Sequence, residues 1–294
     1  MRSAAGLRAA PAIGQAPVPW LRRAFSHRSF AIGAVLTSLL LSCALLSLVW
    51  TPWSPYEIDM GAKLQPPSSS HWLGTDPFGR DIVSLLLVGA RNSITVGIIA
   101  VGIGLLAGTA LGLVAAARRG WVEELIMRLS DFTFAFPAIL SAIMLTAVFG
   151  AGIVNSIIAI GVFNIPTFAR ITRASANALW EREFVLAARA CGNGPWRISL
   201  DHVLPNLQSA LTVQVTIRFA VAILAEAALS YLGLGTQPPQ PSWGRMLAEA
   251  QTLLYQAPLL AVFPGLAIAM AVLGLNLLGD GLRDLGDPRL ARKR

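Results

Sequence analysis

The chain has 294 residues, of which 55% are hydrophobic and only 13% are charged. This composition excludes an ordinary soluble domain and predicts a polytopic membrane protein. The formal net charge of +8 could attract nucleic acid, but the basic residues lie in patches between apolar runs, and no nucleic-acid-binding motif accompanies them. We therefore expect no nucleic-acid partner, and we expect the positive patches to meet membrane lipid at the cytoplasmic face.

The first part of the chain consists of a basic tail, an apolar run and a polar loop. Residues 1–28 carry five arginines and no acidic residue, which predicts a cytoplasmic N-terminal tail. The uncharged run at about 30–50 is long enough to form a first span. Residues 51–92 are rich in Pro and Ser, a composition typical of turns, and we expect them to form an outer loop.

The second expected span, at about 93–116, is uncharged and dense in glycine. Gly104, Gly108 and Gly112 recur every four residues and share one helix face. Such a face allows another helix to pack closely. It is a packing signal and carries no chemistry.

The middle of the chain contains an uncharged run that is too long for one crossing. Phe132–Ala169 spans 38 residues, or about 57 Å as a helix, whereas the apolar core of a bilayer is about 30 Å thick. The run therefore predicts a hairpin of two spans, at about 130–149 and 153–170, joined by a glycine-containing turn. Pro137 and Pro166 lie within these spans, and we expect either one to kink its helix.

A polar segment at 174–206 follows, with apolar residues at helical spacing. They predict a short amphipathic helix whose apolar stripe consists of Phe184, Ala187, Ala188 and Cys191. The helix is expected to stop at 192–194, where two glycines flank an asparagine. Pro195 suits the first position of a second helical piece, and Pro205 is expected to end that piece.

A fifth span is expected at about 207–233, and it contains two charged residues, Arg218 and Glu226. Charges at membrane depth are unfavourable unless they face water, a partner or one another. We therefore expect Arg218 and Glu226 to line a translocation path or a subunit interface, and these two roles stay open. Asp131, at the start of the third span, is a third candidate for the same roles.

The sixth span is expected at about 258–279, and residues 283–294 form a short basic tail. Arginine is abundant in the tails and in the loops assigned to the inside, and sparse in the outer loops. Six crossings with both termini in the cytoplasm satisfy this bias, whereas five or seven would place one basic end outside.

Four stretches of the sequence match known motifs. The stretch HWLGTDPFGRD at 71–81 resembles the "HxLGTDxxGRD" motif of dipeptide, oligopeptide and nickel permeases. Residues 233–244 resemble the "LGLGxQPPxPxWG" loop, and residues 279–288 resemble the "GDxLRDxxDP" ending. The segment 174–206 resembles the cytoplasmic "EAA" loop, although Leu186 stands where the family usually has Glu. Together the four motifs resemble those of one family, the ABC-importer permease subunits of the peptide/nickel class, C-type.

The resemblance implies the type I ABC importer permease fold with six transmembrane helices, in the bacterial cytoplasmic membrane. It also implies a coupling loop that docks on an ATPase. The residues assigned to that loop are Glu183, Phe184, Ala187, Ala188, Gly192, Trp196, Leu204 and Pro205. The implied partners are a second homologous permease subunit, two ABC ATPase subunits or domains, and an extracytoplasmic solute-binding protein. The implied cargo is a di- or oligopeptide, with nickel, a metallophore or glutathione as the alternative.

The residues themselves predict a chain without enzymatic activity. The sequence has no glycine-rich phosphate loop and only two lysines, so we expect this chain to hydrolyse no ATP and to hold no cofactor. The resemblance implies that ATP and Mg²⁺ are held by partner ATPase subunits. No catalytic group and no metal site are expected, and His71 is assigned a structural role. The alternatives are an ion-coupled secondary transporter that uses Arg218, Glu226 or Asp131, and a membrane scaffold subunit.

Overall fold

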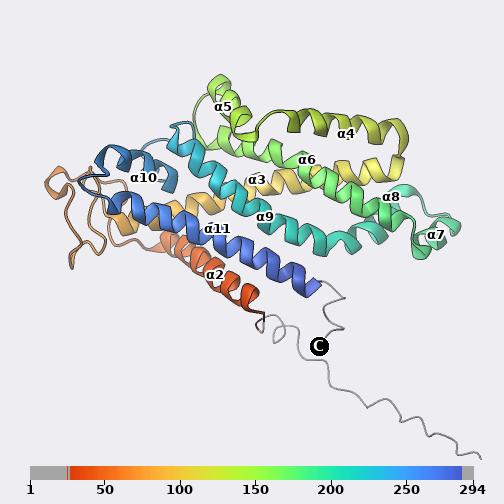
Figure 1. Ribbon diagram of the computed structural model, residues 1–294, viewed down its shortest axis with the longest axis horizontal. Coiled ribbons are helices and arrows are strands. Elements are labelled where there is room, and N and C mark those ends of the chain that lie inside the picture. The colour runs from red at the N-terminus through yellow and green to blue at the C-terminus, as the bar shows by residue number, and fades with distance from the viewer. Residues whose placement is uncertain (1–24, 26, 287–294) are drawn as a thin grey trace, which may run out of the picture.

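The computed structural model describes residue 25 and residues 27–286. Within this part of the chain the structure is helical, with one isolated β-bridge between Thr75 and Asp81 and no strand. Five of the described helices are long and apolar enough to cross a membrane, or six if one bent pair counts as a single span. Figure 1 shows the long helices running along one axis, with α10 near one end and the α7–α8 hairpin at the other. Most of the expected 1–28 tail and residues 287–294 lie outside the described residues.

Helix α2 (Arg28–Val49) packs beside α11 (Leu259–Gly286), and both lie against α3 (Ile82–Arg118) (Figure 1). The helix α11 continues past the expected end of the sixth span, so the start of the expected C-terminal tail is helical. The short helix α10 (Trp243–Ala250) and the turn η3 (Gln251–Leu253) precede α11.

The glycine face predicted for the second span is a packing face in the structure. Gly104, Gly108 and Gly112 all lie against α6 (Ile153–Trp180). A Cβ atom at Gly108 would fall 2.6 Å from the Phe168 Cβ atom, closer than two carbon atoms can pack. Glycine at these three positions therefore lets α3 and α6 approach each other closely.

The start of α3 corrects the expected outer loop, which was placed at 51–92. The helix begins at Ile82, about three turns before the expected second span. Asp81 provides the reason, because its Oδ2 atom accepts a hydrogen bond from the Ser84 backbone N–H at 2.8 Å and caps the helix. The helical residues up to 92 are therefore not loop.

The third expected span is broken into two helices. The amphipathic helix α4 (Gly120–Ala135) and the apolar helix α5 (Ala138–Phe149) meet at an angle of 85°. Proline has no N–H to donate and holds the residue before it in an extended conformation, which is how Phe136 is found. The expected kink at Pro137 is thus a full break, while α6 continues through Pro166. The expected turn at 150–152 joins α5 to α6.

The expected end at Pro205 is wrong. The helix α8 (Pro195–Ile198) leads through a π-helical turn, η2 (Ser199–Val203), into α9 (Leu204–Tyr231), so that helical structure is continuous from 195 to 231. In the π-helical turn the Leu204 N–H reaches back to the Ser199 carbonyl. This wider turn accommodates Pro205, which has no N–H to give.

Candidate coupling surface and buried polar sites

The turn after α7 (Glu183–Ala190) is built by a backbone that only glycine adopts readily. Gly192 has a φ of +82°. Its N–H donates to the Arg189 carbonyl at 2.9 Å, and the Asn193 N–H donates to the Ala188 carbonyl at 3.1 Å. This pair of hydrogen bonds is the Schellman pattern that closes a helix end. Pro195 then occupies the first turn of α8, so both the predicted stop and the predicted restart are confirmed.

The packed face of α7 differs from the predicted stripe. Val185 is completely buried and Ala188 nearly so, in the same apolar cluster as Ile198 and Val203. Phe184, Ala187 and Cys191 are exposed instead. Both sets of positions satisfy helical spacing, so periodicity alone does not choose between them. Only the direction from which α6 and α9 approach makes the choice.

We call the exposed apolar side chains of the hairpin, taken together, the α7–α8 surface. It consists of Phe184, Leu186, Ala187, Trp196 and Leu200. Trp196 has 57% of its surface exposed and Leu186 has 50%. Figure 1 shows α7 and α8 beyond the ends of the neighbouring helices. Of the other predicted coupling residues, Glu183 and Pro205 are exposed and Leu204 is half-buried.

A cavity of about 380 Å³ lies behind the turn. Arg119 at the end of α3, Trp180 at the end of α6, and Arg189 and Gly192 on the hairpin all line it. The hairpin is therefore held through Val185 on one side and bordered by an open polar space on the other.

Glu226 lies on α9 with no exposed surface. Its Oε1 atom accepts hydrogen bonds from the hydroxyls of Ser230 at 2.7 Å and Thr236 at 3.2 Å, and its Oε2 atom accepts from Ser93 at 3.4 Å. These donors come from α9, from the loop after α9 and from α3. The carboxylate thus joins three segments inside the chain and faces no open surface in this structure.

Arg218, two turns earlier on α9, has a different environment. It lines a cavity of about 140 Å³ between α5, α6 and α9. Its Nε atom is buried and has no hydrogen-bond partner among the described residues. Asn164 of α6 lines the same cavity and is 4% exposed. The sequence analysis missed Asn164. Its amide side chain lies within an apolar span, and a polar group in such a position is a signal of function.

Asp131 is separate from both of these residues. It pairs with Arg170 near the surface of the bundle, where the Arg170 guanidinium also stacks 4.3 Å from the Phe134 ring centre. About half of each charged side chain is exposed. The three charged candidates therefore occupy three sites, and the structure brings none of them together.

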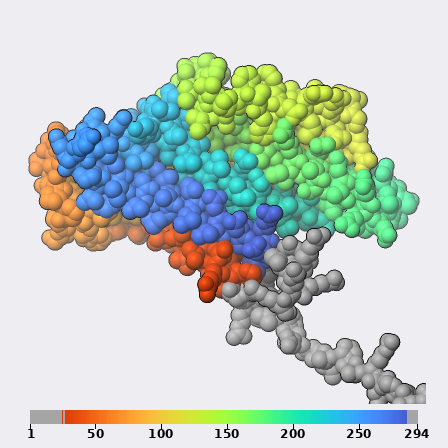
Figure 2. Space-filling view, viewed as in Figure 1, coloured from red at the N-terminus to blue at the C-terminus, as the bar shows by residue number. Residues whose placement is uncertain are grey.

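The end of the molecule that carries α10 is closed by a network of charges. We define the cap as residues 51–81 together with residues 232–256. Arg80 pairs with Asp76 at 2.6 Å and with Glu249 of α10 at 2.9 Å, and Arg245 pairs with Glu249 at 2.9 Å. Figure 2 shows the 51–81 loop against α10. The i,i+4 spacing of Arg245 and Glu249 was a signal that the sequence analysis did not use.

His71 has a structural environment in the cap. Its Nδ1 atom lies 3.1 Å from the Asp81 Oδ1 atom, and its ring packs 5.0 Å from the Trp53 ring. Among the described residues no group of three or more His, Cys, Asp or Glu side chains is arranged to hold a metal ion.

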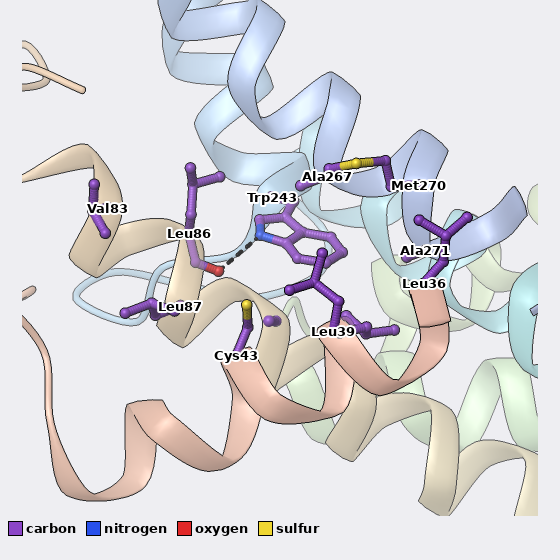
Figure 3. Close-up of a pocket in the computed structure, with 12 residues that line it drawn as sticks. Leu36, Leu39, Cys43, Val83, Leu86, Leu87, Trp243, Ala267, Met270 and Ala271 are labelled. Carbon is purple, nitrogen blue, oxygen red and sulfur yellow. Dashed lines mark hydrogen bonds between the residues drawn. The ribbon is translucent and has the colours of Figure 1, made fainter. Parts of the chain in front are cut away.

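An apolar cavity of about 250 Å³ lies between α2, α3, α10 and α11 (Figure 3). Leu39, Cys43, Leu87 and Met270 contribute to its wall. The Trp243 ring closes one side, and its Nε1 atom donates to the Leu86 carbonyl at 3.1 Å (Figure 3). With that donor satisfied and no charged group in the lining, this cavity has nothing to recognise a polar cargo.

The chain is similar to known transport proteins. A family model described as "Binding-protein-dependent transport system inner membrane component" matches residues 108–292. A glutathione transport system permease protein of Pectobacterium atrosepticum is 43% identical over 279 residues, which cover 92% of each chain. A dipeptide transport system permease protein of Alkalihalophilus pseudofirmus is 42% identical over 276 residues, which cover 92% of this chain and 90% of the relative. A chain from an inward-facing structure of the methionine ABC transporter MetNI superimposes with a TM-score of 0.59 at 16% identity, covering 69% of this chain and 97% of that chain.

These likenesses and the helical architecture define a multi-pass inner-membrane transport component with the type I ABC importer permease fold. The chain belongs to the peptide/nickel ABC importer permease family, as its motifs predicted. The membership confirms the predicted multi-pass inner-membrane location.

Proposed function

We propose that this chain is one of two permease subunits of an ATP-driven importer of short peptides, and that the α7–α8 surface docks on an ATPase subunit at the cytoplasmic face. Two ATPase subunits would hold ATP and Mg²⁺, and a solute-binding protein would deliver the cargo on the opposite side. The second permease subunit would complete the translocation path.

The observation that carries the proposal is the α7–α8 surface. Its apolar side chains lie on a hairpin whose turn is fixed by backbone hydrogen bonds and whose other face is packed into the bundle. A soluble partner is the kind of molecule that covers such a surface outside the membrane. Leu186, where the family usually has Glu, makes this contact more apolar than the family pattern implies.

The continuous helix from 195 to 231 supplies a route for the mechanical signal. It spans 37 residues, or about 55 Å at the rise of an α-helix. A push on α8 therefore moves the other end of α9, where Glu226 holds α3 and the loop after α9. ATP binding shifts the equilibrium between the inward-open and outward-open arrangements only through contacts that differ between them.

Short peptides are the proposed cargo because two relatives bear the names of dipeptide and glutathione permeases. Glutathione is itself a small peptide, so both names describe one class of cargo. A nickel or metallophore importer is the alternative, and uptake of labelled dipeptide, glutathione and Ni²⁺ by the complete transporter separates these cargoes.

The docking role is tested by a pair of valine substitutions. Gly192→Val places a β-branched residue at a φ of +82°, a conformation that such residues rarely adopt. Gly194→Val adds the same side chain at a φ of −72°, where it fits. A Cβ atom at either position meets nothing within 4 Å, so the two variants differ in backbone strain and not in crowding.

In reconstituted transporter, we expect Gly192→Val to hydrolyse ATP without importing peptide, and Gly194→Val to keep the two activities coupled. Import per ATP is the measured quantity. Normal import per ATP in Gly192→Val would count against the docking role of the hairpin.

A further inference from the structure

The cavity between α5, α6 and α9 contains a positive charge that the chain itself does not neutralise. Arg218 takes part in none of the ion pairs found among the described residues, and its buried Nε atom has no acceptor there. A guanidinium within a membrane-spanning helix is costly unless something pairs with it. The structure therefore leaves a position for an anion.

The second polar group in the lining has the matching chemistry. The Asn164 side chain is 96% buried, the complement of its 4% exposure, and makes no hydrogen bond with another described residue. An amide NH₂ group and a guanidinium are both donors, and together they suit a carboxylate, which only accepts when ionised. The rest of the lining is apolar, with side chains such as Ile139, Phe163 and Leu224.

We propose that Arg218 and Asn164 form a subsite of the translocation path that binds the C-terminal carboxylate of the imported peptide. This proposal rests on the proposed function, because it takes its cargo from there. The planar guanidinium offers two parallel N–H donors to a carboxylate, and the low-dielectric wall strengthens that contact.

The size of the cavity limits the subsite to part of the cargo. Its volume of about 140 Å³ is close to that of a cavity of about 150 Å³ that holds one benzene molecule. That space holds a carboxylate and the atoms next to it, whereas a whole di- or tripeptide is larger. The amino end and the side chains of the peptide would lie outside it.

The position of the cavity fits a transient site. One wall is α5, the 12-residue helix that follows the 85° break at Pro137. Another wall is α9, which is continuous with the α8 end of the hairpin proposed to receive the ATPase. Movement of α9 relative to α5 therefore changes the cavity, so that the carboxylate is bound in one arrangement and released in the other.

The test uses proteoliposomes that contain the complete transporter with its binding protein. The probes are alanylphenylalanine and its C-terminal amide, and kcat/KM for import is measured for each. The binding protein has its own preference between the two probes, but that preference is the same for every permease variant. It therefore cancels when the acid-to-amide ratio of a variant is divided by that of the unmodified chain.

We expect Arg218→Gln to lower kcat/KM for the free acid at least about tenfold, the effect of losing one charged hydrogen bond, while the amide changes little. Arg218→Lys keeps the charge and retains part of the preference for the acid. Asn164→Asp places a carboxylate beside the guanidinium and abolishes the preference. Arg128→Gln is the control, because Arg128 lies on α4 with 75% of its side chain exposed, and it leaves the ratio unchanged.

Other outcomes overturn the subsite in different ways. Equal losses for acid and amide in Arg218→Gln, with less assembled complex, would show that Arg218 pairs with a carboxylate of the second permease subunit. An unchanged ratio in an assembled Arg218→Gln transporter would show that the guanidinium does not contact the cargo. Failure of the unmodified transporter to import either probe would overturn the proposed function, and this subsite with it.

Discussion

The cap and the α7–α8 surface lie at opposite ends of the same bundle (Figure 1). They differ in whether their side chains find partners within the chain. In the cap, Arg80 bridges Asp76 and Glu249, and both acidic partners are largely buried. At the other end, Phe184 and Trp196 are exposed although both are aromatic. At one end the chain satisfies its own charged groups, and at the other it leaves apolar side chains exposed.

The two ends should therefore contribute differently to the stability of the isolated chain. Buried ion pairs and hydrogen bonds fix the geometry of the cap, because breaking one of them leaves an unpaired group. An exposed apolar surface adds little to the stability of the isolated chain, because nothing covers it there. Substitutions at the two ends should therefore separate folding from coupling.

The largest expected effect compares two glycines with nearly the same backbone. Gly79 in the cap has a φ of +77° and Gly192 has a φ of +82°. A Cβ atom at Gly79 would collide with the Asp59 carbonyl, whereas one at Gly192 meets nothing within 4 Å. We expect Gly79→Ala to lower the free energy of unfolding by about 3 kcal/mol, and Gly192→Ala by about 1 kcal/mol from the left-handed backbone alone.

Thermal unfolding of the purified chain in detergent measures this pair. Equal losses for the two variants would show that crowding in the cap contributes nothing, and the contrast between the ends would then have to be abandoned.

The second effect concerns the carboxylate that ties the cap to α9. Glu226→Leu removes the acceptor of the Ser93, Ser230 and Thr236 hydroxyls. Hydrogen bonds between membrane helices contribute about 0.6 kcal/mol each on average, so we expect a loss of about 2 kcal/mol in the free energy of unfolding. Glu226→Gln keeps an acceptor and a similar shape, and we expect it to lose less than half as much.

Proteolysis of the loop after α9 reports the same substitution locally, since the Thr236 hydroxyl and backbone are both held at this site. Faster cleavage in Glu226→Leu than in Glu226→Gln is expected. Identical cleavage in the two variants would mean that the carboxylate does not hold the loop.

The sequence predicted the parts of the fold that depend on local chemistry. Glycine spacing gave the packing face of α3, and the order Gly192 then Pro195 gave the helix stop and restart. The length of the uncharged run at 132–169 predicted the turn at Gly150–Gly152 that joins α5 to α6. Each of these features follows from residues close together in the chain, so a single pattern determines it.

The features that sequence reasoning missed depend on contacts between distant segments. Val185 and Phe184 fit helical spacing equally well, and the approach of α6 and α9 decided which one is buried. Proline at 137 breaks a helix and proline at 205 does not, because a π-helical turn accommodates the second. The Arg218 cavity is lined by three helices, two of which are distant from α9 in the sequence, so no single sequence window could predict it.

The smallest expected effect on folding is also the sharpest test of the contrast. Trp196→Ser removes the largest side chain of the α7–α8 surface. Because 57% of Trp196 is exposed, the free energy of unfolding of the isolated chain should fall by only about 1 kcal/mol, less than for the fully buried Glu226. In the assembled transporter the same ring would be covered, and truncating a buried aromatic anchor weakens an interface by about 2 kcal/mol or more. Binding of the purified ATPase subunit should therefore fall about thirtyfold.

Trp121→Ser on α4 is the matched control, because Trp121 is 76% exposed but lies outside that surface. The Trp121→Ser variant should bind the ATPase normally. Equal binding by both variants would place the ATPase elsewhere on the subunit.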